Sequence, residues 1–139
     1  MTLAVDASAL VKRYLHEPGR DLVLEAMADD RLWCASELCR AEAMLVLHRV
    51  ASGPRQARDL WRSFRDDWDA FNVVPVDDRC LARATEIGVE FGLRTVDAVH
   101  LAAADRLPRP VSYLTFDRHQ IPGALALGLQ VVSPLASEP

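Results

Sequence analysis

The sequence predicts an α/β fold with three layers, α/β/α, in which helices cover both faces of a central, mostly parallel sheet of five strands. Five short apolar runs have the length of buried strands, and they alternate with longer segments whose apolar residues recur at helical spacing. Such alternation favours parallel strands joined by crossover helices. Because the chain has 139 residues and is 50% hydrophobic, we expect one domain, residues 1–139, with a substantial core.

The first half of the chain is divided into strands and helices by residues that break or cap helices. Pro18 and Gly19 separate two helical patterns, Ser36 is a suitable N-cap for a long helix, and Pro54 opens the next helix. The expected elements are a strand over 3–5, helices over 7–15 and 20–29, a strand over 32–35, and helices over 36–51 and 54–70.

The second half continues the alternation. Asp77 and Thr95 are suitable N-caps, and Gly92 and Pro108 mark helix ends. Pro75 indicates an edge strand or a strand end, because proline cannot donate a ladder hydrogen bond. The expected elements are a strand over 73–76, helices over 77–91 and 95–107, a strand over 111–116, a short helix over 121–127 and a strand over 129–132.

The composition indicates a cytoplasmic protein without a membrane segment. No apolar stretch reaches the roughly 18 residues that cross a bilayer, and Asp6 interrupts the first apolar run where a signal peptide needs an unbroken one. Cys34, Cys39 and Cys80 are odd in number and lack a CxxC spacing. We therefore expect buried thiols rather than a disulfide framework or a zinc site.

The net charge of -4 would by itself argue against a nucleic-acid partner, because phosphate binding depends on basic surface. A divalent cation bound in an acidic pocket would reverse the local field, however, so the overall sign does not exclude RNA. Lys12 is the only lysine, and the other fifteen basic residues are arginine, which suits bidentate phosphate contacts. Composition bias of the source genome explains this skew at least as well.

Four carboxylates that are far apart in the chain form the candidate site. Each lies at the end of a predicted strand or near the start of a predicted helix, and in a parallel α/β fold these junctions meet along one edge of the sheet. Two carboxylates about 4 Å apart repel by roughly 4 kcal/mol at an effective dielectric near 20. A hard divalent cation with oxygen ligands, Mg²⁺ or Mn²⁺, is the simplest remedy. The four residues are Asp6, Glu42, Asp97 and Asp117.

These residues also have structural interpretations. Asp6 is equally suited to cap the helix that follows it, and Asp117 fits ordinary turn chemistry after a strand. Glu42 lies on an apolar helix, where a buried carboxylate needs compensation from a metal or from an ion pair with Arg49 on the same face. Asp97 follows the expected cap by two residues, where the positive helix end favours a charged carboxylate.

His100, one turn after Asp97, stands in a helix that is otherwise nearly all apolar. It could bind a metal or carry a proton. A histidine in such a helix is more often a hydrogen-bonded structural residue, and we favour that interpretation.

The helix expected over 54–70 carries an aromatic stripe and an arginine stripe. The aromatic stripe predicts core or a protein interface rather than a base-stacking platform. The arginine stripe could bind RNA phosphates, but aspartates beside it favour a solvated face with salt bridges. The aromatic stripe comprises Ala57, Trp61, Phe64 and Trp68, and the arginine stripe comprises Arg55, Arg58, Arg62 and Arg65.

The chain contains, in this order, the segments VDASALVKRYLHEPG, SELCRAEAMLVLHR, GLRTVDAVHLAAA and YLTFDRHQIPGALALGLQVVSP. Together they resemble the PIN-domain family, in particular the VapC toxins of bacterial toxin-antitoxin pairs. The resemblance spans nearly the whole chain, and it places the family's metal-binding acidic residues on the four carboxylates. Thr115 matches the hydroxyl that accompanies the last acidic residue, and Ser8 a small polar residue beside the first.

The resemblance implies a PIN-like fold and an endoribonuclease that depends on Mg²⁺ or Mn²⁺. It implies that metal-activated water cleaves RNA phosphodiester bonds, that a small VapB-like antitoxin blocks the active-site groove, and that the protein forms a homodimer. Asp6, Glu42 and Asp97 would hold the principal ion, and Asp117 would bind a second ion or position water. All four would be catalytic in this sense.

Three other classes of protein share parts of this pattern. A receiver domain needs a lysine after its last strands, and no lysine follows Lys12. A haloacid-dehalogenase-type phosphatase needs a second aspartate near the first strand, where this chain has Ser8. The serious alternative is a PIN-fold module that binds RNA or protein without cleaving, and the complete acidic set argues against it.

Overall fold

The computed structural model describes residues 1–135 and contains a five-stranded sheet in which every strand pair is parallel. The order across the sheet is β3-β2-β1-β4-β5, so β1 is the central strand. The predicted α/β fold with a five-stranded sheet is therefore confirmed, with no antiparallel pair in the described part. The strands are β1 (Thr2–Val5), β2 (Leu32–Ser36), β3 (Asn72–Val74), β4 (Val111–Leu114) and β5 (Gln130–Val132).

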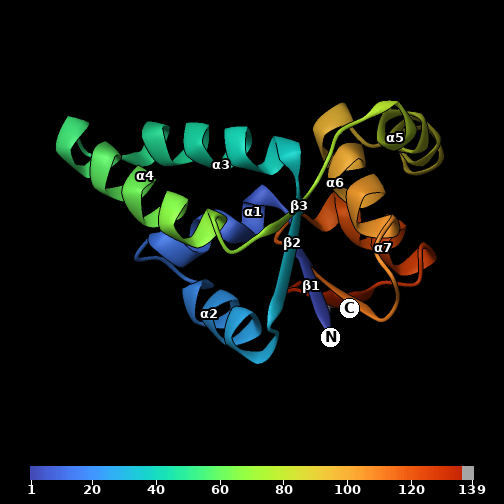
Figure 1. Ribbon diagram of the computed structural model, residues 1–139, viewed down its shortest axis with the longest axis horizontal. Coiled ribbons are helices and arrows are strands. Elements are labelled where there is room, and N and C mark those ends of the chain that lie inside the picture. Colours follow the sequence, from blue (N-terminus) through green and yellow to red (C-terminus); the bar gives the residue numbers. More distant parts are fainter. Residues whose placement is uncertain (136–139) are drawn as a thin grey trace.

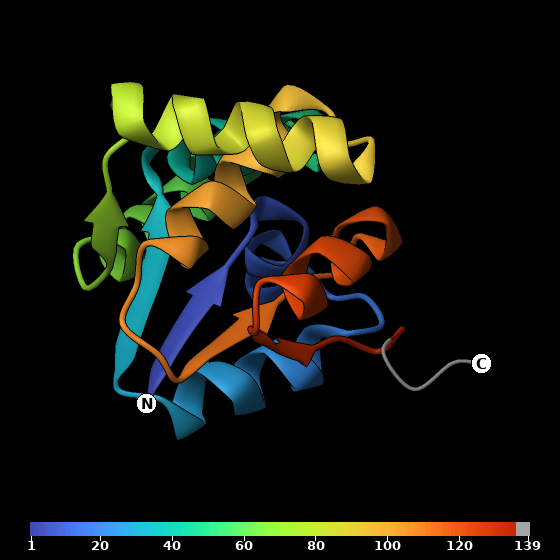
Figure 2. The ribbon, with the colours of Figure 1, turned by 90° about the vertical axis from the view of Figure 1, so that its right-hand side faces the viewer.

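Helices cover both faces of the sheet, as Figure 1 shows with the sheet nearly edge-on and Figure 2 from the side of the C-terminal helices. Successive side chains of a strand point to opposite faces. Leu3 and Val5 of β1 therefore join one core cluster and Ala4 the other. The first cluster packs under α1 (Ala7–Leu10), α2 (Arg20–Asp29), α3 (Glu37–Val50) and α4 (Pro54–Trp68), and the second under α5 (Asp78–Phe91), α6 (Thr95–Asp105) and α7 (Ile121–Ala126).

Several predicted elements extended past their observed ends, and two of these differences have a clear structural reason. The helix predicted over 7–15 is α1 followed by a 3-10 turn, η1 (Val11–Tyr14), whose Tyr14 hydroxyl donates to Asp67 of α4 at 2.7 Å. The strand predicted over 111–116 ends at Leu114, because β1, its partner, ends at Val5. The other predicted boundaries lie within two residues of those observed.

Two predicted helix caps differ from those observed. Ser36 holds the N-cap position of α3, but its hydroxyl makes no capping bond and instead lies 2.8 Å from Nδ1 of His100. The N-cap of α6 is Arg94 rather than Thr95, which is the first helical residue. Asp77 caps α5 as predicted, with its carboxylate accepting from the Cys80 N–H at 2.9 Å.

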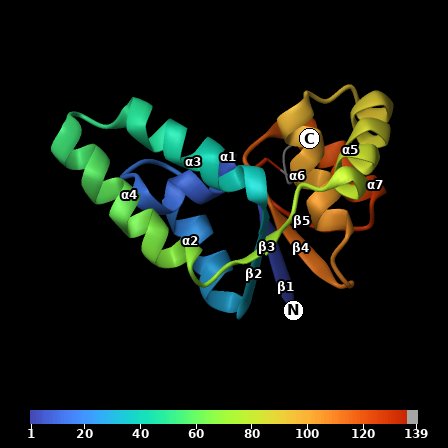
Figure 3. The same cartoon turned by 45° about the horizontal axis from the view of Figure 1, so that its top comes forward.

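The aromatic stripe of α4 belongs mainly to the core. Figures 1 and 3 show α3 and α4 running side by side away from the sheet. Phe64 is fully buried, stacks on Trp68 at 5.5 Å between ring centroids, and meets Tyr14 edge-on at 6.0 Å. The indole N–H of Trp61 donates to the Met44 carbonyl at 2.9 Å, which joins α4 to α3.

The three cysteines, Cys34, Cys39 and Cys80, are buried free thiols, as expected. Among the helices of residues 1–135, none has both the length and the apolar character required to cross a bilayer.

Candidate functional site

The site lies where the order of the strands reverses. The chain leaves β1 to build β2 and β3 on one side of it, and later builds β4 and β5 on the other side. In open α/β sheets such a switch point leaves a crevice at the carboxyl ends of the two neighbouring strands, where ligands bind. Asp6 directly follows β1, while Thr115 and Asp117 follow β4. Both aspartates are therefore brought to this crevice by the topology itself.

Asp6 is the most buried of the four candidate carboxylates, with 1% of its surface exposed. One oxygen accepts the Ala9 N–H at 3.0 Å, which makes Asp6 the N-cap of α1. The other accepts the Thr115 hydroxyl at 2.7 Å and an amide N–H of Gln120 at 2.9 Å. The Ser8 hydroxyl lies within 2.9 Å of both oxygens. The carboxylate that caps α1 is therefore also one that lines the cavity between the strand ends.

Ser8 and Thr115 join the two strand ends around Asp6. Besides donating to Asp6, the Ser8 hydroxyl accepts the N–H of Phe116 at 3.0 Å, and the Thr115 hydroxyl accepts the N–H of Asp117 at 3.0 Å. Each hydroxyl thus bonds both a carboxylate and the backbone that follows β4. These two residues position Asp6 relative to Asp117.

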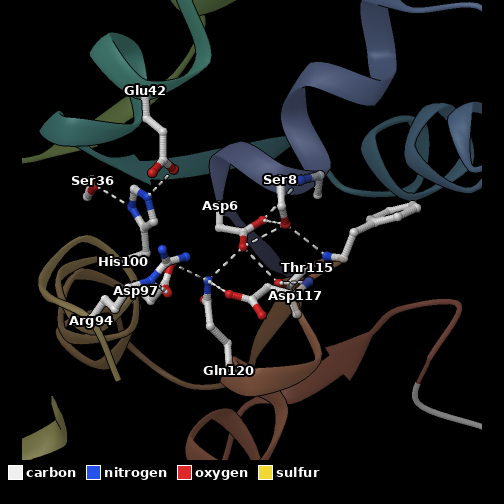
Figure 4. Close-up of polar contacts among 12 residues, drawn as sticks. Asp6, Ser8, Ser36, Glu42, Arg94, Asp97, His100, Thr115, Asp117 and Gln120 are labelled. Atoms are coloured by element: carbon white, nitrogen blue, oxygen red, sulfur yellow. Dashed lines mark hydrogen bonds and ion pairs between the residues drawn. The ribbon is translucent and has the colours of Figure 1, made fainter. Parts of the chain in front are cut away.

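The amide of Gln120 brings three carboxylates together (Figure 4). Its Nε2 lies 2.9 Å from Oδ2 of Asp6, 3.3 Å from Oδ1 of Asp97 and 3.3 Å from Oδ2 of Asp117. The three carboxylates come from the end of β1, the first turn of α6 and the residue after Phe116. Three acidic side chains that are distant in sequence therefore converge on one atom.

Glu42 lies in the same cavity but has a different partner. Its Oε1 is 3.0 Å from Nε2 of His100, whose Nδ1 lies against the Ser36 hydroxyl. Because a carboxylate only accepts, Nε2 carries the hydrogen and donates it. The ion pair considered with Arg49 is not the one the structure forms. His100 is a buried, doubly hydrogen-bonded residue that orients Glu42, which agrees with the structural interpretation we favoured.

A cavity of about 410 Å³ opens over these groups. It is lined by all four predicted carboxylates and by Ser8 and Gln120, while two arginines, Arg49 and Arg94, stand at its margin. Arg94 is 91% exposed and its Nε lies 3.8 Å from Asp97, so it is available to a ligand. An acidic floor with basic groups at the edge suits a cation that in turn binds a phosphate.

Two of the carboxylates, Asp6 and Asp97, are costly to keep charged in this environment, as the direction of their pKa shifts shows. Burial raises the pKa of Asp6 despite the positive potential of His100 and hydrogen bonds from Ser8, Thr115 and the Ala9 N–H. The pKa of Asp97 is raised first by burial and then by the negative charge of Asp117. A neutral amide does not neutralise these charges.

A hard cation would neutralise them, and a donor set of carboxylate oxygens fits such an ion. As the side chains stand, residues 1–135 contain no group of three or more histidine, cysteine, aspartate or glutamate residues arranged to hold a metal ion. The Gln120 amide nitrogen lies between the three aspartates instead.

Gln120 was not predicted from the sequence, and neither Arg94 nor Arg49 was assigned to the site. Gln120 is uncharged and follows Asp117 by three residues, one turn, which was the only available signal. The predicted arginine stripe, in contrast, is exposed along α4 and does not line the cavity. Its members Arg55, Arg58, Arg62 and Arg65 include one weak ion pair, Arg62 to Asp59 at 3.9 Å.

Comparison with known proteins identifies the family. The family model of the PIN domain matches residues 3–122, which is most of the chain. The chain belongs to the PIN-domain family. Its sequence is 33% identical over 131 residues to ribonuclease VapC46 of Mycobacterium tuberculosis, covering 94% of this chain and 95% of that protein. The resemblance to VapC proteins is thereby confirmed.

Solved structures of other proteins share the fold. A toxin-antitoxin complex from Klebsiella pneumoniae matches with a TM-score of 0.68 at 20% identity, over 95% of this chain and 97% of that one. FitAcB from Neisseria gonorrhoeae matches with a TM-score of 0.74 at 15% identity, over 96% and 99% of the two chains.

We predict that Asp97→Asn stabilises the metal-free protein while removing part of its site. Because the pKa of Asp97 is raised on folding, its charged form destabilises the folded state above that pKa, and the penalty disappears as the pH falls through it. The melting temperature in EDTA should therefore rise by about 2–5 °C near neutral pH, and by less towards acid pH.

Differential scanning calorimetry from pH 4 to pH 8 measures this effect. Asp59→Asn, on the exposed face of α4, is the matched control and should change the melting temperature by less than about 1 °C. A loss of stability in Asp97→Asn at neutral pH would show that the carboxylates do not repel as described.

Proposed function

We propose that this protein is a VapC-like toxin, a divalent-metal-dependent endoribonuclease that cleaves RNA phosphodiester bonds. The observation that carries the proposal is the convergence of Asp6, Asp97 and Asp117 on one atom at the switch point of the sheet, with Glu42 in the same cavity. Membership of the PIN-domain family, and a relative named as a ribonuclease, support the choice of RNA as substrate.

The cofactor is proposed to be Mg²⁺, with Mn²⁺ as a substitute. Asp6, Asp97 and Asp117 would lie nearest the ion, and Glu42 would complete the acidic set. The Gln120 amide contacts Asp6, Asp97 and Asp117, whereas Glu42 contacts His100. These contacts support a proposed principal site made by the three aspartates, in place of the expected set of Asp6, Glu42 and Asp97. When bound, the ion would lower the pKa of water and stabilise negative charge on the phosphate.

In this proposal the side chains of the protein hold the carboxylates in place and do not themselves act as a nucleophile. Ser8 and Thr115 fix the buried carboxylate of Asp6, so its oxygens have little freedom to move. His100 fixes Glu42 in the same way from the α6 side. Preorganised oxygens of this kind bind a cation, and orient a phosphate on it, without a large cost of ordering.

Arginines at the margin of the cavity are proposed to contact RNA phosphates. Arg94 and Arg49 line the same cavity as the four carboxylates, where the scissile phosphate would lie. The stripe along α4 remains a proposed, more distant path for RNA, because its exposed guanidinium groups follow a single helix face. Phosphate contacts of this kind add affinity and make it depend on salt.

We predict that Arg94→Ala weakens RNA binding about 5–10-fold and lowers the salt dependence of binding by roughly one counterion. Its surface pair with Asp97 contributes little to folding, so stability should hardly change. Fluorescence anisotropy with a labelled single-stranded RNA, in an Asp6→Asn background that prevents cleavage, measures both quantities. Arg79→Ala, on the exposed start of α5, is the control; equal losses in the two variants would contradict the assignment.

The proposed partner is a small VapB-like antitoxin that blocks the active-site groove. An apolar depression lined by Leu38, Leu45 and Val96 adjoins Glu42 and Arg49 at the cavity, and Leu45 is 53% exposed. A partner that covers it would also cover the acidic floor. We further propose a homodimer and the cytoplasmic location expected from the sequence; the mass in solution tests the first and fractionation of cells the second.

Toxicity provides a test of the partner. Expression of the wild-type chain in a bacterial host should arrest growth, and co-expression of the product of a small adjacent open reading frame should relieve the arrest. Asp6→Asn should fold but should not arrest growth, because its site lacks one charge. If Asp6→Asn arrested growth as strongly as the wild type, toxicity would not depend on the acidic site.

We predict that the purified protein cleaves single-stranded RNA only with Mg²⁺ or Mn²⁺, and that EDTA stops the reaction. Asp6→Asn and Asp97→Asn should each lower the rate by more than about 100-fold. Gel analysis of end-labelled RNA measures cleavage, and Asp59→Asn should remain active.

Three outcomes separate this proposal from its rivals. Cleavage that persists in both site variants would show that the activity lies elsewhere. RNA or protein binding by the wild type without turnover in either metal would favour the non-cleaving module. Cleavage in EDTA would refute the metal requirement.

A further inference from the structure

The side chain of Gln120 is buried at the centre of the acidic cavity. Gln120 ends the 3-10 turn η2 (Arg118–Gln120), which follows Asp117, and only 1% of its surface is exposed. Its Nε2 lies within 3.3 Å of an oxygen of each of the three aspartates, and Figure 4 draws these contacts as dashed lines meeting at the amide. Because this buried amide lies between the carboxylates, any ligand that binds there must either contact it or displace it.

The orientation of this amide follows from its partners. Tyr113, fully buried in β4, has its hydroxyl directed at Oε1 of Gln120 and donates to it. A flipped amide would turn its oxygen towards three carboxylates that can only accept while they are charged. The nitrogen must therefore face the aspartates, and Tyr113 holds it there.

The amide satisfies the aspartates only in part. An amide nitrogen has two hydrogens, whereas three carboxylates lie around it, and two of the three distances are 3.3 Å. The group is also neutral, so it leaves the repulsion among the carboxylates in place. A divalent cation would offer both charge and more coordination positions, with oxygens much closer than 2.9 Å.

We propose that Gln120 is a positioning residue that holds the three aspartates together in the metal-free protein and competes with the cation for them. The amide and an ion cannot both occupy the point between the carboxylates, so entry of the ion requires the side chain of Gln120 to move. Its contacts with the aspartates stabilise only the metal-free state. Through linkage, they weaken metal binding. This inference rests on the proposed metal-dependent function and concerns the same site.

Gln120→Met tests the competition, because methionine has a similar length, no N–H donor and a sulfur that binds Mg²⁺ and Mn²⁺ poorly. The dissociation constant for Mn²⁺, measured by isothermal titration calorimetry, should fall about 5–10-fold. The melting temperature in EDTA should fall by several degrees, while that of the Mn²⁺-saturated protein should stay near the wild-type value. Gln120→Ala, which leaves open space, should change both quantities in the same directions.

Gln130→Met is the matched control, because Gln130 is an exposed glutamine on the edge strand β5. It should leave both the dissociation constant and the two melting temperatures unchanged. A residue with a merely structural role would behave differently from the competing residue, since its loss would lower the melting temperature equally with and without Mn²⁺.

The outcomes distinguish this inference from the proposed function. If the wild type binds Mn²⁺ and both Gln120 variants bind it with equal or lower affinity, the competition is refuted and the metal site stands. If the wild type itself fails to bind Mn²⁺ and does not cleave RNA with it, the proposed function fails and the competition fails with it.

Discussion

The burial of the Asp6 carboxylate between two parallel strand ends is the constraint from which the site follows. A charged group there is costly unless it is hydrogen-bonded. The chain meets this requirement with Ser8, Thr115, Gln120 and the N–H of Ala9. Each of these donors comes from a segment that must then lie at the end of β1 or β4, so the same bonds that satisfy Asp6 also assemble the cavity.

Satisfying hydrogen bonds is not the same as neutralising charge, and the difference explains the proposed chemistry. Asp97 and Asp117 approach Asp6 closely enough to share one donor, and burial raises the pKa of Asp97 and of Asp6. The fold thus holds acidic groups close together at the place where we propose that a cation binds, and perturbed pKa values of this kind are common at functional sites. Glu42 is hydrogen-bonded to His100 instead. Three of the four acidic side chains therefore converge on the Gln120 amide, and the fourth does not.

The sequence predicts those parts of the structure that depend on position along the chain. Asp6 and Asp117 follow strands, and parallel strands place such residues at one edge, so their meeting could be foreseen. The partner of Glu42 could not, because helical spacing reveals Arg49 on the same helix whereas His100 lies 58 residues away. Gln120 carries no charge and stands in a short turn, so only the packing of β4, η2 and α6 reveals its role. The end of β4 could not be predicted from its own sequence either, because it is set by the end of the neighbouring strand β1.

Anomalous diffraction from crystals soaked in Mn²⁺ examines the central site most directly. We expect a peak within coordination distance of Asp6, Asp97 and Asp117, with the Gln120 amide displaced from its present position between them. A peak elsewhere on the protein, or no peak while the amide still bonds all three carboxylates, would contradict the view that these residues form a metal site.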